Sequence, residues 1–115
     1  MKFVFITLFP ELIAGAASVS ILGRAQKEGL IEVLCVNPRD YATDRHRSVD
    51  DTTCGGGAGM VLRVDTYLAA LEKARCLAPD ALVAALTPVG ETLCQARVTA
   101  TFPSWPGSYF SLRPL

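Results

Sequence analysis

The residues of this chain that are best suited to chemistry lie in one segment, from Asp40 to Met60. The segment ends in a glycine run, and its unobstructed backbone N–H and C=O groups can lie flat on a planar base or cradle an anion. A flexible turn is the ordinary alternative, because glycine runs alone are weak evidence. A standard phosphate-binding loop is not indicated, since no Gly-Lys-Ser/Thr follows. The glycines are Gly55, Gly56, Gly57 and Gly59.

A charged group precedes the glycines, and its cationic side chains are of the type that contacts phosphates. Three acidic side chains in the same segment could neutralise it internally, so charge alone favours a self-neutralised loop. A single histidine is more often structural or solvated than catalytic. The cationic group is Arg45 and Arg47 with His46 between them, and the acidic residues are Asp44, Asp50 and Asp51.

A second candidate segment is Leu86-Thr87-Pro88-Val89-Gly90, which follows an apolar run. A strand that ends in a rigid proline and a permissive glycine offers its carbonyls and amides to a ligand. An ordinary connection between a strand and a helix fits the same residues, and without further context that plainer interpretation is preferred.

Apolar runs and turn residues predict the elements that position these two segments. Strands are predicted at residues 3–8, 31–36 and 81–86. Helices are predicted from Pro10, from Ser20 to a stop at Gly29, from Asp65, and from near Glu91, with Ser20 and Asp65 as caps. Residues 39–59 show no apolar period and are expected to form a long loop.

This alternation predicts an α/β domain with a mostly parallel sheet. Ligands of such sheets gather beyond the carboxyl ends of the strands. The loops at residues 38–60 and 87–90 both follow strands and are expected on that side.

Composition narrows the functional classes. The 115 residues suit one domain, half are apolar, and the formal net charge is zero, which is unusual for a free-standing nucleic-acid binder. The apolar start is too short to span a membrane and lacks a cleavage site for a signal peptide. One histidine and widely spaced cysteines argue against a metal site or a disulfide framework and favour free thiols in a cytosolic protein. The cysteines are Cys35, Cys54, Cys76 and Cys94.

Taken together, the segments resemble the bacterial tRNA (guanine-N1-)-methyltransferase family, of the knotted SPOUT class. Order and spacing agree over roughly residues 1–96. The matching pieces are Thr7-Leu8-Phe9-Pro10-Glu11, Ser20-Ile21-Leu22-Gly23-Arg24-Ala25, Asn37-Pro38-Arg39-Asp40-Tyr41, Asp44-Arg45-His46-Arg47-Ser48-Val49-Asp50-Asp51, Gly55-Gly56-Gly57-Ala58-Gly59-Met60 and Leu86-Thr87-Pro88-Val89-Gly90.

The resemblance implies a cytoplasmic homodimer that transfers a methyl group from S-adenosylmethionine to N1 of the guanine 3′ of the tRNA anticodon. It implies a three-layer fold, the first part of a trefoil-knot domain whose knot is incomplete in this chain. It assigns donor binding to Leu86, Thr87, Pro88 and Gly90. It assigns the guanine and tRNA to Asp50, to Gly55, Gly56, Gly57 and Gly59, and to the neighbouring Arg45, His46 and Arg47.

The chain departs from the family pattern in two places. Thr53 and Cys54 stand where the family has a proline and an aromatic residue, so we expect a looser loop. The family continues with further donor-binding loops, a catalytic aspartate and a C-terminal helical domain. We therefore expect residues 1–100 to be a partial SPOUT domain without a catalytic base and to be inactive alone. A non-catalytic RNA-binding or dimerising remnant is the alternative, and a separate α/β nucleotide binder is a third.

Residues 101–115 differ in character, with three prolines, several aromatics and no helical or strand period. We expect a tail foreign to the family and hypothesise that it arose from a shifted reading frame. Sequencing the coding DNA tests this, because codons that yield no family-like residues in any frame exclude the hypothesis.

Overall fold

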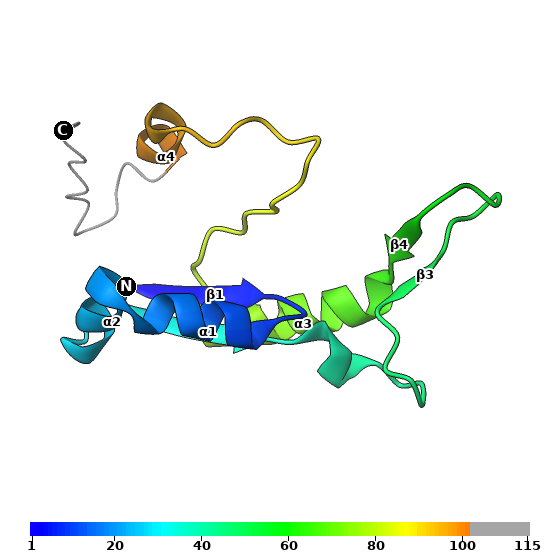
Figure 1. Ribbon diagram of the computed structural model, residues 1–115, viewed down its shortest axis with the longest axis horizontal. Coiled ribbons are helices and arrows are strands. Elements are labelled where there is room, and N and C mark those ends of the chain that lie inside the picture. Colours follow the sequence, from blue (N-terminus) through cyan, green and yellow to red (C-terminus); the bar gives the residue numbers. More distant parts are fainter. Residues whose placement is uncertain (102–115) are drawn as a thin grey trace. The chain divides into compact units, whose positions relative to one another are not determined.

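The computed structural model describes residues 1–101 (Figure 1). The chain divides into two compact units, Met1–Leu82 and Val83–Leu115, and residues 102–115 of the second unit are not described. Apart from Thr101, which ends a helix, the expected tail at 101–115 lies outside the described residues. No helix within residues 1–101 combines the length and the apolar character needed to cross a membrane.

The first unit is built on two parallel strands, β1 (Lys2–Ile6) and β2 (Glu32–Val36). They pair from Lys2 opposite Glu32 to Ile6 opposite Val36. Helices α1 (Pro10–Ser18) and α2 (Ser20–Lys27) connect them. The strands predicted at residues 3–8 and 31–36 and the helix predicted from Pro10 are thus confirmed.

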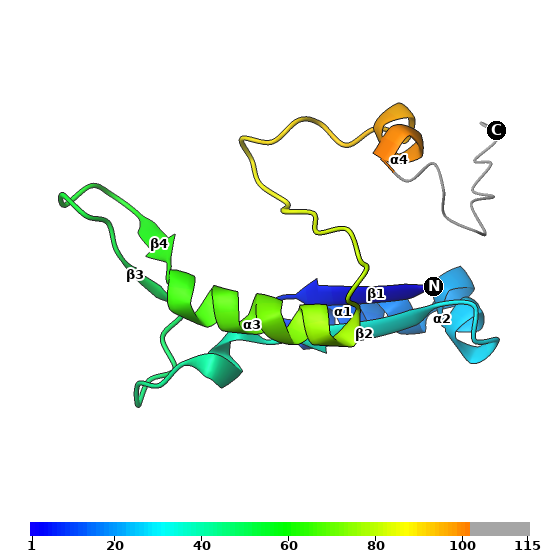
Figure 2. The same ribbon diagram turned by 180° about the vertical axis from the view of Figure 1, so that it is seen from behind.

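A third helix, α3 (Val64–Leu77), packs on the sheet face opposite α1, so the unit has three layers (Figures 1 and 2). Ala70 is fully buried and Ala74 nearly so, and both cluster with Val36. Small side chains at these positions let the helix approach the strands closely. Val4, Ile6, Tyr41 and Leu77 surround this core.

The end of α2 follows the sequence prediction, whereas its start does not. Gly29 has a φ of +71°, and its N–H donates to the Gln26 carbonyl at 3.0 Å while that of Leu30 donates to Ala25 at 2.9 Å. This pair of bonds satisfies the last carbonyls of a helix and favours glycine. The predicted Ser20 cap is wrong, because Val19 precedes α2 and Ser20 lies inside the helix with no capping bond from a side chain. A single residue between α1 and α2 leaves no room for a separate cap.

Close contact between α1 and α2 makes Gly23 sensitive to substitution. A Cβ atom at Gly23 would lie 2.1 Å from the Ser18 carbonyl oxygen, whereas one at Gly15 would meet nothing within 4 Å. We expect Gly23→Ala to lower the free energy of unfolding by about 1–3 kcal/mol. Gly15→Ala is expected to raise it by about 0.5–1 kcal/mol. Urea unfolding of both variants checks the pair, and equal stabilities would contradict the tight helix contact.

The long loop predicted at residues 39–59 is wrong, because regular elements interrupt this part of the chain. It holds a short 3-10 helix, η1 (Pro38–Tyr41), and an antiparallel hairpin of β3 (Asp50–Thr52) and β4 (Met60–Leu62). The strands are short and their side chains exposed, so no apolar alternation marks them. In Figures 1 and 2 the hairpin projects away from the β1–β2 sheet, at the amino-terminal end of α3 and beyond the carboxyl ends of the strands.

The strand predicted at residues 81–86 is also wrong, since the described residues hold no strand there. Leu82 and Leu86 are 59% and 89% exposed. An apolar run becomes a strand only with a hydrogen-bonding neighbour and covered faces, and within the described residues 1–101 β1 and β2 pair only with each other. The helix expected near Glu91 begins later, as α4 (Gln95–Thr101).

Candidate functional site

The glycine run forms the tip of the β3–β4 hairpin. Gly55, Gly56 and Gly59 have φ values of +98°, +76° and +102°, a region that other residues rarely adopt. The Thr53 hydroxyl donates to the Gly57 carbonyl at 2.6 Å, and the Gly56 N–H donates to the Thr53 carbonyl at 3.2 Å. Thr53 thus supplies a hydrogen bond across the loop. The tip exposes backbone that side chains do not obstruct.

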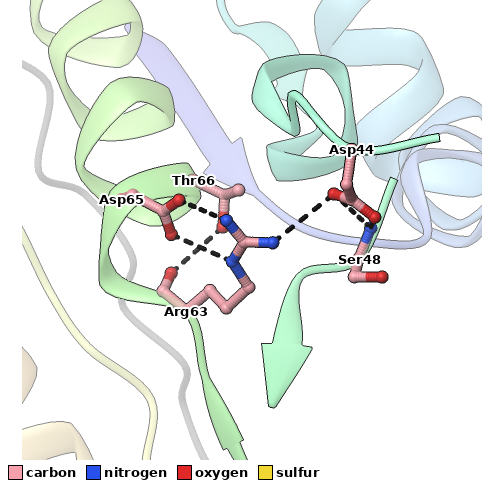
Figure 3. Close-up of polar contacts among 5 residues, drawn as sticks. All are labelled: Asp44, Ser48, Arg63, Asp65 and Thr66. Atoms are coloured by element: carbon pink, nitrogen blue, oxygen red, sulfur yellow. Dashed lines mark hydrogen bonds and ion pairs between the residues drawn. The ribbon is translucent and has the colours of Figure 1, made fainter. Parts of the chain in front are cut away.

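The cationic group lies on a tight turn, residues 44–48, that precedes the hairpin. Both carboxylate oxygens of Asp44 accept from the Ser48 N–H, at 3.1 and 3.0 Å (Figure 3). The Arg47 N–H donates to the Asp44 carbonyl at 3.1 Å, and Arg47 has a φ of +50°. The turn leaves three side chains exposed: Arg45, His46 and Arg47.

The expected internal neutralisation of these cations is wrong. The Asp44 carboxylate is engaged by Ser48 and by Arg63, and that of Asp51 accepts from the Thr52 N–H at 2.7 Å. Within residues 1–101, Arg45 and Arg47 form no ion pair. Their charges therefore face solvent and are available to an anionic partner.

Arg63, which sequence reasoning missed, joins the turn, the hairpin and α3 (Figure 3). Its backbone N–H donates to the Val49 carbonyl at 2.8 Å. Its guanidinium contacts Asp65 at 2.6 and 3.2 Å and Asp44 at 3.4 Å. The predicted Asp65 cap is wrong, because Asp65 pairs with Arg63 and α3 has no capping bond from a side chain. Asp44 lies 19 residues before Arg63 in the sequence, so no local sequence pattern indicates this contact.

Both carboxyl groups around Arg63 have lowered pKa values. The Ser48 N–H holds the pKa of Asp44 below its ordinary value, with a smaller contribution from Arg63. The hydrogen bond from Arg63 lowers the pKa of Asp65. A carboxyl group whose pKa is lower in the folded state stabilises that state when the pH is above its ordinary, unfolded-state pKa. This stabilisation is lost as the pH falls through the lowered, folded-state pKa.

We therefore expect the 44–48 turn to be unchanged from neutral pH down to about pH 4 and to loosen below it. The amide signal of Ser48 in NMR spectra, followed from pH 7 to pH 2, checks this. An apparent midpoint at or above the ordinary carboxyl value, about 3.9, would contradict the assigned contacts. In Asp44→Asn the low-pH transition of this amide should disappear.

The second candidate segment lies in the unit Val83–Leu115. The Gly90 N–H donates to the Thr87 carbonyl at 3.1 Å, closing a turn over Pro88. A Cβ at Gly90 would lie 3.2 Å from Thr87 atoms, so only hydrogen fits without a shift. The turn lines an open cavity of about 600 Å³ together with Leu86 and neighbouring residues. The four predicted donor-binding residues, Leu86, Thr87, Pro88 and Gly90, line this open concavity as neighbours in the chain.

The sequence comparison decides the family. Residues 1–102 match the sequence profile of the family described as tRNA (Guanine-1)-methyltransferase TrmD. The chain belongs to this family. The TrmD match covers both candidate segments and confirms the resemblance that the sequence motifs indicated.

Relatives with the name tRNA (guanine-N(1)-)-methyltransferase agree with this result. The chain is 52% identical over 93 residues to that of Rhizorhabdus wittichii, which covers 81% of this chain and 38% of the relative. It is 50% identical over 98 residues to that of Deinococcus radiodurans, covering 83% and 34%. The chain therefore spans little more than a third of the length of these TrmD relatives.

A solved structure supports the fold. The crystal structure of tRNA (m1G37) methyltransferase from Aquifex aeolicus matches with a TM-score of 0.75 at 29% identity, over 87% of this chain and 45% of that one. This likeness confirms the α/β fold of a TrmD protein of the SPOUT class. A methyltransferase family also requires a methyl donor.

Proposed function

We propose that this TrmD chain serves the methylation of N1 of the guanine 3′ of the tRNA anticodon, with S-adenosylmethionine as the donor. The observation that carries the proposal is the family match over residues 1–102, which spans both candidate segments. The name of the Aquifex aeolicus neighbour, a tRNA (m1G37) methyltransferase, supports the same position of the tRNA.

In this proposal the hairpin faces the substrate. The backbone of Gly55, Gly56, Gly57 and Gly59 lies against the guanine ring, with Asp50 at the start of β3 beside it. The exposed cations of the 44–48 turn contact tRNA phosphates, because they have no ion pair within residues 1–101. These cations are Arg45 and Arg47, and His46 between them is a further proposed contact.

The donor belongs to the turn of the second unit. Leu86, Thr87, Pro88 and Gly90 would hold S-adenosylmethionine, which supplies a reactive methyl group on sulfur. Gly90 suits this turn because a Cβ at this position would lie 3.2 Å from Thr87 atoms. N1 of neutral guanine bears a proton, so transfer also needs a base and in-line placement. We assign no base to the residues of this chain.

We further propose that residues 1–100 are a partial trefoil-knot domain and that residues 101–115, of which the family match includes the first two, are a non-family tail. A cytoplasmic homodimer is the proposed state of the complete enzyme. A non-catalytic RNA-binding or dimerising remnant is the second candidate, favoured by the limited share of the relatives that the chain spans.

A chimera tests the proposal. The 93 residues that align with the Rhizorhabdus wittichii relative replace their counterparts in that protein, and the resulting full-length protein is called the chimera. We expect it to methylate N1 of the target guanine at a rate comparable to that of the parent, by mass spectrometry of digested tRNA. A tRNA with adenine at that position is the control and should remain unmodified.

Two outcomes decide between the candidates. A folded chimera that binds tRNA but transfers no methyl group would refute the methylation proposal and favour the remnant. The 115-residue chain alone is expected to show no turnover, and turnover at the rate of the parent would refute the partial-domain assignment.

A further inference from the structure

The guanidinium of Arg63 lies where three segments meet: the 44–48 turn, the end of β4 and the start of α3 (Figure 3). Its backbone continues the β3–β4 ladder, because the Arg63 N–H donates to the Val49 carbonyl. Its carbonyl accepts from the Thr66 hydroxyl at 3.0 Å, at the first turn of α3. Val49 and Thr66 are 2% and 1% exposed, so both backbone contacts are anchored in buried residues.

The side chain of Arg63 is engaged on two sides. Two of its nitrogens contact the two oxygens of Asp65, the fork-to-fork arrangement that arginine forms with carboxylates. The third nitrogen contacts Asp44 at 3.4 Å, and the other bonds of that carboxylate go to the Ser48 N–H. The Arg63 side chain is 26% exposed, and those of Asp44 and Asp65 are 32% and 60% exposed.

This arrangement gives Arg63 a different role from that of its cationic neighbours. Its charge is balanced by two carboxylates, whereas Arg45 and Arg47 have no ion pair within residues 1–101. Asp44 is the closing residue of the turn that carries those arginines. A contact from Arg63 to Asp44 therefore ties the turn to the base of the glycine hairpin.

We propose that Arg63 is a positioning residue for tRNA, which holds the 44–48 turn against the base of the hairpin so that the cationic side chains and the glycine backbone meet one substrate together. The inference rests on the proposed function. It assigns Arg63 no contact with tRNA, and its effect passes through Asp44.

The first test uses the 115-residue chain. In Arg63→Met the exchange rate of the Ser48 amide is expected to rise several-fold, because Asp44 loses the partner that fixes its carboxylate. Arg75→Met removes the same charge from an exposed position of α3 and should leave that rate unchanged. Equal exchange rates in Arg63→Met and the unmodified chain would overturn the inference.

The second test measures tRNA affinity and kinetics in the chimera. Arg63→Met is expected to raise the Kd and the KM for tRNA about tenfold, with the KM for the donor unchanged. Arg63→Lys keeps the charge but lacks the planar fork, so its Kd and KM for tRNA should lie between those of the unmodified chimera and those of Arg63→Met. A loss confined to thermal stability, with the Kd for tRNA unchanged, would show a merely structural role and overturn the inference.

The sign of the Asp44→Ala effect separates positioning from direct contact. Positioning predicts weaker tRNA binding in Asp44→Ala, and no further loss in the double variant with Arg63→Met. A direct contact of Arg63 with phosphate predicts tighter binding in Asp44→Ala, because a negative charge is removed and Arg63 is released. Tighter binding would overturn the inference. Since Kd and amide exchange need no turnover, they judge it even where failure to methylate has refuted the proposed function.

Discussion

Replacement of Gly59 by alanine in the chimera is expected to lower kcat/KM for tRNA about tenfold or more. Gly59 has a φ of +102°, outside even the small left-handed region that L-residues enter. Forcing alanine into such a conformation costs about 1–3 kcal/mol, and the loop avoids this strain only by changing shape. In the proposed complex, a changed hairpin tip no longer presents the same backbone to the guanine. Initial rates over a range of tRNA concentrations measure the effect.

Gly57 provides the matched control, because it lies in the same loop and has no positive φ. A Cβ at Gly57 would meet only the Thr53 hydroxyl oxygen, at 3.6 Å, which is an ordinary contact. Gly57→Ala should therefore keep the conformation of the loop and lose less activity than Gly59→Ala, any loss measuring how far the added methyl group crowds the guanine. If Gly57→Ala and Gly59→Ala lost activity equally, access to the glycine surface would matter rather than its conformation, and the argument from φ would fail.

The elements that could be predicted from sequence are those fixed by local chemistry. The first two strands are mainly apolar after an initial Lys2 or Glu32, and Asn37-Pro38 ends the second of them. Gly29 ends α2 because the last turn needs a positive φ. Within the candidate site, the glycine run and the exposed cations were likewise visible as residue types with a chemical meaning.

The features that could not be predicted depend on partners distant in sequence. The β3–β4 hairpin has short, exposed strands, one of which begins with two aspartates, and such residues are poor strand formers in isolation. Arg63 was missed because its contact with Asp44 crosses 19 positions. The strand predicted at residues 81–86 is the opposite case: the local apolar pattern is good, but no strand forms because no neighbouring strand within residues 1–101 is there to pair with it.

Loss of the charge at position 47 is expected to weaken tRNA binding without loss of stability. Arg47 has a φ of +50°, a left-handed conformation that asparagine tolerates better than arginine. Arg47→Asn should therefore leave the thermal unfolding temperature of the chimera unchanged or slightly raised. The same substitution removes one proposed phosphate contact, so the slope of log K against log salt should fall by about one. Fluorescence anisotropy with labelled tRNA over a salt series measures both affinity and slope.

General damage to the fold would lower both stability and affinity, whereas Arg47→Asn is expected to weaken tRNA binding alone. Arg47→Lys keeps the charge and should keep the slope, whereas Arg75→Gln removes an equal charge outside the turn and should leave both quantities unchanged. If Arg47→Asn kept the full salt slope, Arg47 would not contact phosphate. The phosphate contacts would then have to come from cations other than Arg47, and Arg63 is not among them, because it is already neutralised by Asp44 and Asp65.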